Sequence, residues 1–157
     1  MPFPGFDRLV LSHVELQAVM RELRYASWRT ALSSVFGIYL LTDTRDGKQY
    51  VGKADGEESI RQRWSLYATN GHGGNVDLRG LDPSSFRFSL LRVFDPATPT
   101  RDINAAESHF KDALATRQHG LYRNYGCRTN QSPEHKQSSN EHWCDRREDE
   151  GRLPLPA

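Results

Sequence analysis

A glutamate within an apolar helical stripe is the first residue of this sequence that needs a chemical explanation. Glu107 falls on the same predicted helix face as Ile103 and Phe110, so its carboxylate is expected to face a core. Burying a lone carboxylate is costly unless a cation neutralises it. Two interpretations stay open at this point: an ion pair with an arginine at the edge of the stripe, or coordination of a metal ion.

Two tyrosines lie on the two arms of a predicted β-hairpin, around the turn signal Asp46-Gly47. With a four-residue loop over 44–47, Gly52 lies opposite Tyr39, and the backbones of Tyr39 and Tyr50 are diagonal neighbours about 7 Å apart. With a two-residue loop, the tyrosines share a face but lie far apart. We favour the first register, because Gly52 has no side chain and leaves room beside Tyr39.

An arginine and a glycine-rich loop add candidates for contacts to an anion. Arg63 lies between Ile60 and Trp64, so it borders the apolar face of its helix and not the fully solvated side. The loop 71–75 contains three glycines and His72. This loop either closes over a substrate, with His72 contacting a phosphate, or is a plain flexible connection.

The elements that must position these residues follow the order β–β–α–β–α. They are predicted as strands over 35–41, 48–52 and 86–94, a helix opened by a capping box at 55–58, and a long helix over 102–119 ended by Gly120. Tyr67 shares the apolar face of the first of these helices and is expected in the core. The predicted fold class is α/β (α+β), with a small three-stranded antiparallel sheet flanked by helices.

Three zones divide the chain. Residues 1–34 are predicted to form an N-terminal accessory helix, capped by Ser12, and a linker through Trp28. Residues 35–126 form the domain that carries the candidate site. Residues 127–157 lose all hydrophobic periodicity, and we expect a polar, poorly ordered tail.

The hairpin and its surroundings resemble a known family. Gly37-Ile38-Tyr39 and, eleven residues later, Tyr50-Val51-Gly52 resemble the signature of the GIY-YIG nuclease superfamily, and Lys53-Ala54 extends the second half to its UvrC-like YVGKA form. Three further residues match the family's helix arginine, metal-binding glutamate and late asparagine: Arg63, Glu107 and Asn124. The resemblance covers about residues 35–126, some three-fifths of the chain.

The resemblance implies hydrolysis of phosphodiester bonds in DNA by an endonuclease. Glu107 is then the single protein ligand of Mg²⁺ or Mn²⁺, ions that keep several waters and bind substrate phosphate. Arg63 is implied to stabilise the pentavalent transition state through a bidentate grip on phosphate oxygens.

The two tyrosines take their roles from the same resemblance. A phenol with a pKa near 10 needs help to act as a base at neutral pH. We assign Tyr50 as general base, assisted by Lys53, and Tyr39 to positioning water or phosphate. Asn124 is expected to hold the loop or a tyrosine in place. The candidate substrate-binding residues are Gly52, Arg61 and His72.

Composition and charge limit the strength of DNA binding and the cellular location that we expect. The 157 residues carry a net charge of +1, so we expect weak and salt-sensitive affinity for DNA. No apolar run is long enough for a transmembrane helix, and no secretory signal is recognisable, so a cytoplasmic protein is expected. Four residues of the tail could ligate zinc, but their spacing matches no common finger: Cys127, His135, His142 and Cys144.

Two other functions remain open. One is a catalytically weak module that only binds nucleic acid. The other is a nuclease toxin or defence effector that acts with a protein partner, through the N-terminal helix or the C-terminal tail. The sequence contains no recognisable zinc finger, helix-turn-helix or long basic helix to read DNA. A nuclease of this kind either cuts with little sequence preference, or obtains recognition from a partner or from the N-terminal helix.

Overall fold

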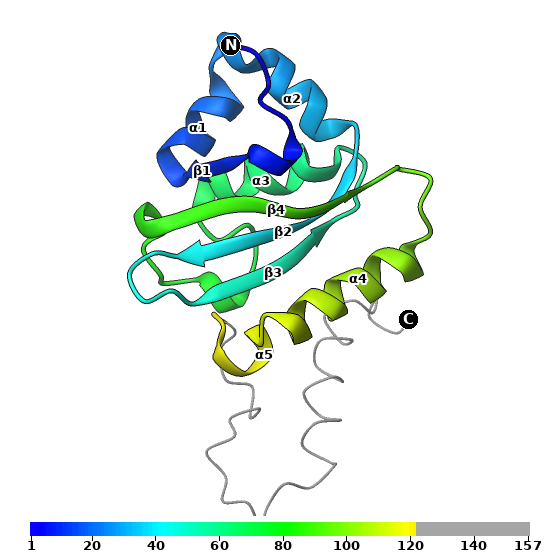
Figure 1. Cartoon of the computed structure of the whole chain (residues 1–157). Coiled ribbons are helices and arrows are strands. Elements are labelled where there is room, and N and C mark those ends of the chain that lie inside the picture. The colour runs from blue at the N-terminus through cyan, green and yellow to red at the C-terminus, as the bar shows by residue number, and fades with distance from the viewer. Residues whose placement is uncertain (122–157) are drawn as a thin grey trace, which may run out of the picture. The chain divides into compact units, whose positions relative to one another are not determined.

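A four-stranded antiparallel sheet, ordered β1-β4-β2-β3, forms the centre of the molecule (Figure 1). The computed structural model describes residues 1–121. The strands are β1 (Val10–Ser12), β2 (Phe36–Asp43), β3 (Gln49–Ala54) and β4 (Phe86–Phe94). The α+β class predicted from the sequence is confirmed, but the prediction of three strands is wrong because β1 was missed.

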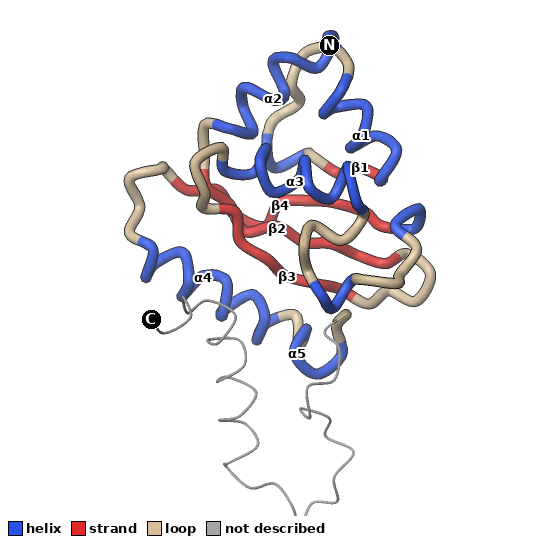
Figure 2. The backbone as a smooth tube through the Cα atoms, turned by 180° about the vertical axis from the view of Figure 1, so that it is seen from behind, coloured by secondary structure: helices blue, strands red, loops and turns tan. Residues whose placement is uncertain are grey.

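Helices cover both faces of this sheet. The helices are α1 (His13–Arg21), α2 (Ala26–Ser33), α3 (Ser59–Asn70), α4 (Thr100–Ala113) and α5 (Thr116–His119), with short 3-10 turns at Phe6–Arg8, Leu23–Tyr25, Val76–Leu78 and Pro83–Ser85. Figures 1 and 2 show α1, α2 and α3 on one side of the sheet, and α4 on the other side, beside β3. The sheet is therefore enclosed between two helical layers that supply different side chains.

The N-terminal segment is part of this same compact unit. Ser12 caps α1 as predicted: its hydroxyl accepts from the backbone N–H of Glu15, and the Glu15 carboxylate accepts from the backbone N–H of Ser12. The linker predicted through Trp28 is wrong, since α2 occupies that stretch. In place of an appended helix, residues 1–34 add an edge strand and two helices to the domain.

The hairpin has the favoured register. Tyr39 lies opposite Gly52 and Leu41 opposite Tyr50, as the four-residue loop requires. The loop closes because Gly47 adopts a left-handed φ of 75° and its N–H donates to the carbonyl of Asp43 at 2.8 Å. This register places Tyr39, Tyr50 and Gly52 on the sheet face that α3 covers.

Two predicted helix boundaries are wrong. The capping box at 55–58 does not form, because Asp55 binds Lys53 and no side chain caps the start of α3. The helix predicted over 102–119 breaks into α4 and α5 at Ala115, which has a left-handed φ of 52°. The break turns the chain back to the sheet, where the N–H of Leu121 donates to the carbonyl of Gln49 on β3.

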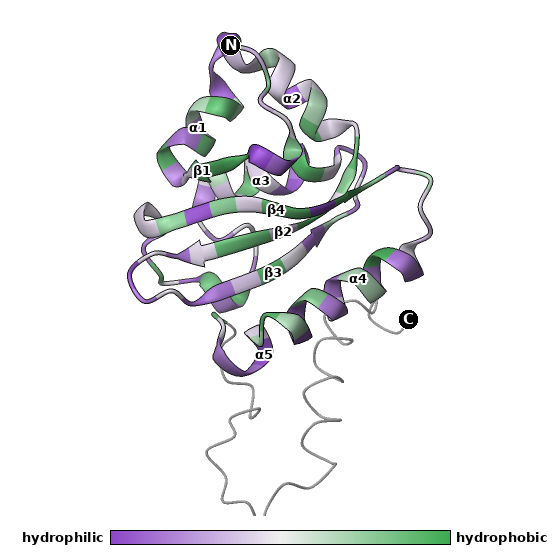
Figure 3. Cartoon of the chain, viewed as in Figure 1, coloured by the Kyte–Doolittle hydropathy of each residue, from purple (hydrophilic) through white to green (hydrophobic). Residues whose placement is uncertain are grey.

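Two hydrophobic clusters hold the layers together. On the α3 side, the largest fully buried side chains include Trp64, Tyr39 and Tyr67. On the α4 side, Ile38 of β2 and Ile103 of α4 belong to the second cluster. Figure 3 shows β2 mostly hydrophobic along its length, whereas α4 alternates between hydrophobic and hydrophilic bands. β2 is apolar because it is buried on both faces.

Within residues 1–121, no helix has the length and apolar character needed to span a bilayer.

Candidate active site

Tyr39 is the centre of a buried polar cluster between β2 and α3. Its side chain is fully buried, and its hydroxyl lies 2.9 Å from the hydroxyl of Tyr67. The Arg63 Nε donates to the same Tyr39 oxygen at 3.3 Å. Arg63 and Tyr67 are one helical turn apart on α3, so both reach the same point of the sheet. The cluster therefore joins a phenol pair to a guanidinium.

Glycines of the two signature tripeptides make room for this packing. A Cβ at Gly52 would lie 2.9 Å from Cε1 of Tyr39 and closer still to its Cζ and hydroxyl oxygen. At Gly37, a Cβ would lie 2.9 Å from Cδ1 of Ile60 on α3. The first glycine lets the Tyr39 phenol cross β3, and the second lets α3 approach β2. The room beside Tyr39 predicted from Gly52 is thus filled by the phenol itself.

Tyr50 completes the aromatic group at the edge strand. Its ring centroid lies 6.5 Å from that of Tyr39, in agreement with the predicted diagonal neighbours. Unlike Tyr39, Tyr50 is only half-buried. Arg63 is half-buried as well, so Arg63 and Tyr50 are the members of this cluster that remain partly exposed to solvent.

The surroundings of Arg63 are unusual for a partly buried cation. Within residues 1–121, no carboxylate lies within ion-pair distance of it. The titratable groups that act on it are phenols, and interaction with Tyr39 raises the pKa of Arg63 above its ordinary value. Burial, followed by the neighbouring Tyr39, raises the pKa of Tyr67 well above 10.0. At neutral pH the cluster thus presents a fixed positive charge and a neutral Tyr67.

Lys53 is not brought to Tyr50. Strand residues alternate between faces, so Lys53 points to the side opposite Tyr50 and Gly52. Its Nζ donates to Oδ1 of Asn104 on α4 at 2.6 Å and to Oδ2 of Asp55 at 3.2 Å. The predicted assistance of Tyr50 by Lys53 therefore has no support in this geometry, and Lys53 ties β3 to α4.

Glu107 is buried on α4, as its stripe predicts, with only 6% of its surface exposed. Its Oε1 lies 3.7 Å from Nζ of Lys111, which is also buried. The alternative of an ion pair is therefore realised, although with a lysine one turn along the helix and not an arginine. Among residues 1–121, no three His, Cys, Asp or Glu side chains gather as a metal site. Within the described part of the chain, Glu107 would therefore serve as a single carboxylate ligand of an ion.

The remaining candidates lie around α3. His72 is half-buried, and its Nδ1 accepts from the backbone N–H of Gly74 at 3.0 Å. The same loop packs against the cluster, because a Cβ at Gly73 would lie 2.7 Å from the Tyr67 ring. Arg61 is half-buried, but residues two apart do not share a helix face, so it is not aligned with Arg63. Asn124 and the four zinc candidates lie outside the described residues.

Sequence reasoning missed the part that Tyr67 takes in the cluster. Tyr67 was expected in the core, and it is, but its hydroxyl binds Tyr39. The available signal was its position four residues after Arg63 on the same face. Asn104 was missed as well, because nothing in its own sequence context shows that it faces Lys53.

Comparisons with protein-family models, with curated proteins and with solved structures each return no significant match.

Proposed function

We propose that this chain is a metal-dependent endonuclease that hydrolyses phosphodiester bonds in DNA through a GIY-YIG-type active site. The observation that carries the proposal is the guanidinium of Arg63, which is half-buried and bonded to a phenol without a carboxylate partner in residues 1–121. A partly desolvated cation of this kind favours binding of an anion. A phosphate group offers two oxygens that the planar fork of a guanidinium can bind together.

Arg63 takes the electrostatic role in this proposal. Negative charge builds on the phosphoryl oxygens as the attacking oxygen approaches, and a preorganised cation stabilises it. Tyr39 fixes the position of the guanidinium, because the buried Tyr39 hydroxyl accepts a hydrogen bond from Nε of Arg63. We therefore assign Tyr39 to positioning Arg63, in place of the role in positioning water or phosphate that the resemblance implies.

Tyr50 is the proposed general base. It retains solvent exposure, whereas Tyr39 and Tyr67 are fully buried and share a hydrogen bond. A base must reach the water whose proton it removes, and only Tyr50 of the three can do so without rearrangement. A general base must first lose its own proton, and the positive charge of Arg63 favours the phenolate form of a phenol nearby.

Glu107 is the residue that would hold Mg²⁺ or Mn²⁺. Its carboxylate is the hard oxygen ligand that these ions prefer, and it is already neutralised by a cation, Lys111. A bound ion would neutralise part of the charge on the phosphate and on the leaving oxygen. Binding at Glu107 requires that the ion replace Lys111 as the partner of the carboxylate.

Substitutions at Arg63 and Tyr50 test the proposal, with Arg61 as matched control. We expect wild type to cleave plasmid and oligonucleotide DNA in Mg²⁺ or Mn²⁺. Arg63→Ala should lower the cleavage rate about 100- to 1,000-fold, and Tyr50→Phe about 100-fold or more. Arg61→Ala removes the same charge from the same helix and should change the rate far less. Equal losses in all three variants would contradict the proposed site.

A further inference from the structure

Two arginines of β4, Arg87 and Arg92, take no part in the proposed active site. They are five residues apart, and in a regular strand an odd separation places two side chains on opposite faces of the sheet. Arg87 lies opposite Thr42 of β2. Arg92 lies opposite Ile38, four positions earlier on β2. Because an even separation keeps side chains on one face, both arginines point to the face of the sheet that α4 packs against.

A β-bulge in β4 accounts for this arrangement. The partner of Tyr39 on β4 is Leu90, and the partner of the preceding β2 residue is Arg92. Leu91 between them is therefore an extra residue in the ladder. The extra residue turns the side chain of Arg92 to the face on which the other arginine lies. Bulges re-aim side chains in this way beside functional sites, so the pair of arginines on one face is a property of the fold that the sequence spacing conceals.

Both guanidinium groups are available to an anion. Arg87 and Arg92 are exposed, and among residues 1–121 neither has a carboxylate within ion-pair distance. The guanidinium of Arg92 lies over the ring of Phe94, with its Cζ 4.7 Å from the ring centroid. This cation–π contact holds the guanidinium against the sheet before a ligand arrives.

The arginines belong to a part of the sheet that α4 does not cover. Figures 1 and 2 show α4 beside β3, at the opposite end of the strand order from β1. Val10 of β1, opposite Ser89, is 55% exposed, and Ser89 and Leu91 are half-buried. None of the strand residues on this part of the sheet is acidic. We call it the open face, and it consists of Val10, Ser12, Arg87, Ser89, Leu91 and Arg92.

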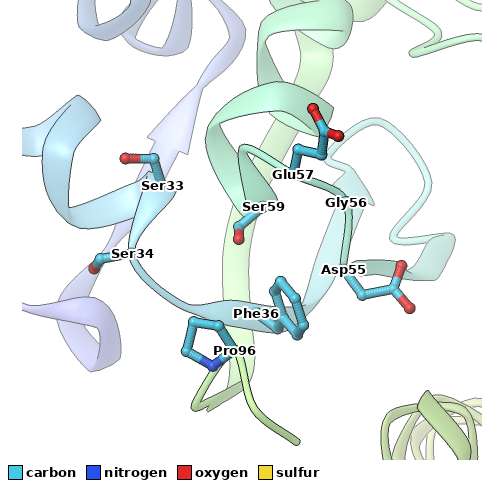
Figure 4. A pocket seen from close by; sticks show the side chains of 8 residues that line it. All are labelled: Ser33, Ser34, Phe36, Asp55, Gly56, Glu57, Ser59 and Pro96. Atoms are coloured by element: carbon cyan, nitrogen blue, oxygen red, sulfur yellow. The ribbon is translucent and has the colours of Figure 1, made fainter. Parts of the chain in front are cut away.

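Acidic residues lie beyond one end of the open face. Phe36, at the start of β2, lines a pocket together with Asp55 and Glu57 (Figure 4). These carboxylates repel an anion at that end, whereas the strand residues in the other direction carry no negative charge. The charge distribution therefore favours an extended anion that lies along β4 from Arg92 toward Arg87 and β1.

We infer that the open face binds a single strand of DNA, a partner that rests on the proposed function. The two arginines lie about 14 Å apart, four residue steps along β2, which about four nucleotides span at the charge spacing of one DNA strand. Each guanidinium donates to a phosphate.

The apolar residues favour a single strand over a duplex. Unpaired bases can lie on Val10 and Leu91, and the plane of the Arg92 guanidinium offers a surface on which a base can stack. A duplex keeps its bases stacked inside and presents mainly phosphates to a flat sheet face. It would therefore leave the exposed side chain of Val10 without a partner.

Fluorescence anisotropy with the full chain tests the inference. The probe is a fluorescein-labelled oligothymidylate of about 12 nucleotides, in EDTA and at about 50 mM NaCl, where we expect a Kd of about 10 µM. Arg87→Gln and Arg92→Gln should each weaken binding about fivefold. The double variant should also lower the slope of log K against log salt by about 1.4, since each phosphate contact in a single strand contributes about 0.7.

Two further variants separate this surface from a general charge effect. Arg21→Gln removes the same charge from the exposed end of α1, on the other side of the sheet, and should leave the affinity within about twofold of wild type. Ser89→Lys adds a cation between the two arginines and should tighten binding about threefold. Circular dichroism of each variant checks that the fold is retained.

Three results would overturn the inference. One is the absence of binding by wild type up to 10-fold above the expected Kd. Another is equal weakening by Arg21→Gln and by the two β4 variants. The third is tighter binding of a duplex of the same length, of oligouridylate or of an oligoglutamate peptide, which would assign the open face to duplex DNA, to RNA or to an acidic protein.

The binding assay is independent of cleavage, because EDTA is present throughout. Wild type that binds oligothymidylate through Arg87 and Arg92 but cleaves no DNA would support the open face and contradict only the proposed nuclease function. Cleavage by wild type, together with unchanged DNA binding by the double variant, would contradict only the open face.

Discussion

The close approach of Tyr39 to Gly52 makes Gly52→Ala an informative substitution. The added Cβ would lie 2.9 Å from Cε1 of Tyr39 and closer to two further atoms of the phenol, whereas ordinary contacts begin near 3.4 Å. Tyr39 is fully buried and bonded to both Tyr67 and Arg63, so it cannot swing away freely. We expect a loss of about 2–3 kcal/mol, at the upper part of the range for overpacked cores.

A double-mutant cycle measures whether the phenol causes this loss. The free energy of unfolding is obtained from urea denaturation of wild type, Gly52→Ala, Tyr39→Ala and the double variant. In the Tyr39→Ala background the clash is absent, and Gly52→Ala should be neutral or stabilise by about 0.5–1 kcal/mol, because alanine loses less backbone entropy than glycine. The expected coupling energy is therefore about 3 kcal/mol.

Gly47→Ala serves as the matched control for this cycle. Alanine at position 47 should also destabilise the fold, but because of the backbone φ of 75° and not because of a clash. No atom lies within 4 Å of a Cβ placed there. Its cost should be the same with and without Tyr39. If Gly52→Ala destabilises both backgrounds equally, the reasoning that the Tyr39 phenol occupies the space above Gly52 is refuted.

Three further predictions follow from the polar contacts. Tyr67→Phe removes one partner of the buried Tyr39 hydroxyl and should cost about 1 kcal/mol in urea unfolding, with slower DNA cleavage; an unchanged free energy of unfolding would contradict the bond. Arg63→Lys keeps the charge but loses the planar fork, so we expect cleavage to fall about 100-fold while the fold is retained by circular dichroism; full activity would argue against a guanidinium-specific role. Hydrogen bonding from Arg45 lowers the pKa of Asp43 in the folded protein below 3.8. The Asp43–Arg45 pair therefore stabilises the fold fully at pH values above the pKa that Asp43 has in the unfolded chain. This stabilisation is lost as the pH falls through the lower pKa that Asp43 has in the folded protein. Asp43→Asn should therefore flatten the fall in stability below about pH 4, measured by urea unfolding at pH 7 and pH 3; an unchanged acid dependence would assign it to other carboxylates.

The hairpin could be predicted because its determinants are local. The turn residues Asp46-Gly47 and the glycine opposite Tyr39 restrict the register, and the structure has the favoured one. The apolar spacing of α3 likewise predicted the burial of Trp64 and Tyr67. These features depend on residues close in sequence and on steric exclusion by a single side chain.

The errors come from contacts between distant segments. β1 has only three residues, too few for a periodic pattern, and exists because Val10–Ser12 pair with β4. The Asn104 partner of Lys53 lies 51 residues away in the sequence. The side of the sheet to which Lys53 points could have been counted from the register, since it differs from that of Tyr50.

The apolar stripe around Glu107 predicts the burial of this residue but not its ionic partner. Its stripe predicts burial, which the structure has, but the pattern does not choose among possible cations. Lys111 lies one turn along α4 and pairs with it at 3.7 Å.

DNA cleavage by Glu107→Gln compared with wild type tests the central claim most directly. Labelled duplex, single-stranded and branched DNA would be incubated with each protein at equal concentration, in Mg²⁺ with and without EDTA. The account predicts that wild type cleaves at least one of these substrates, that EDTA abolishes cleavage, and that Glu107→Gln is inactive while still folded. Absence of cleavage of every substrate by wild type would contradict the proposed function, and full activity of Glu107→Gln would contradict its metal site.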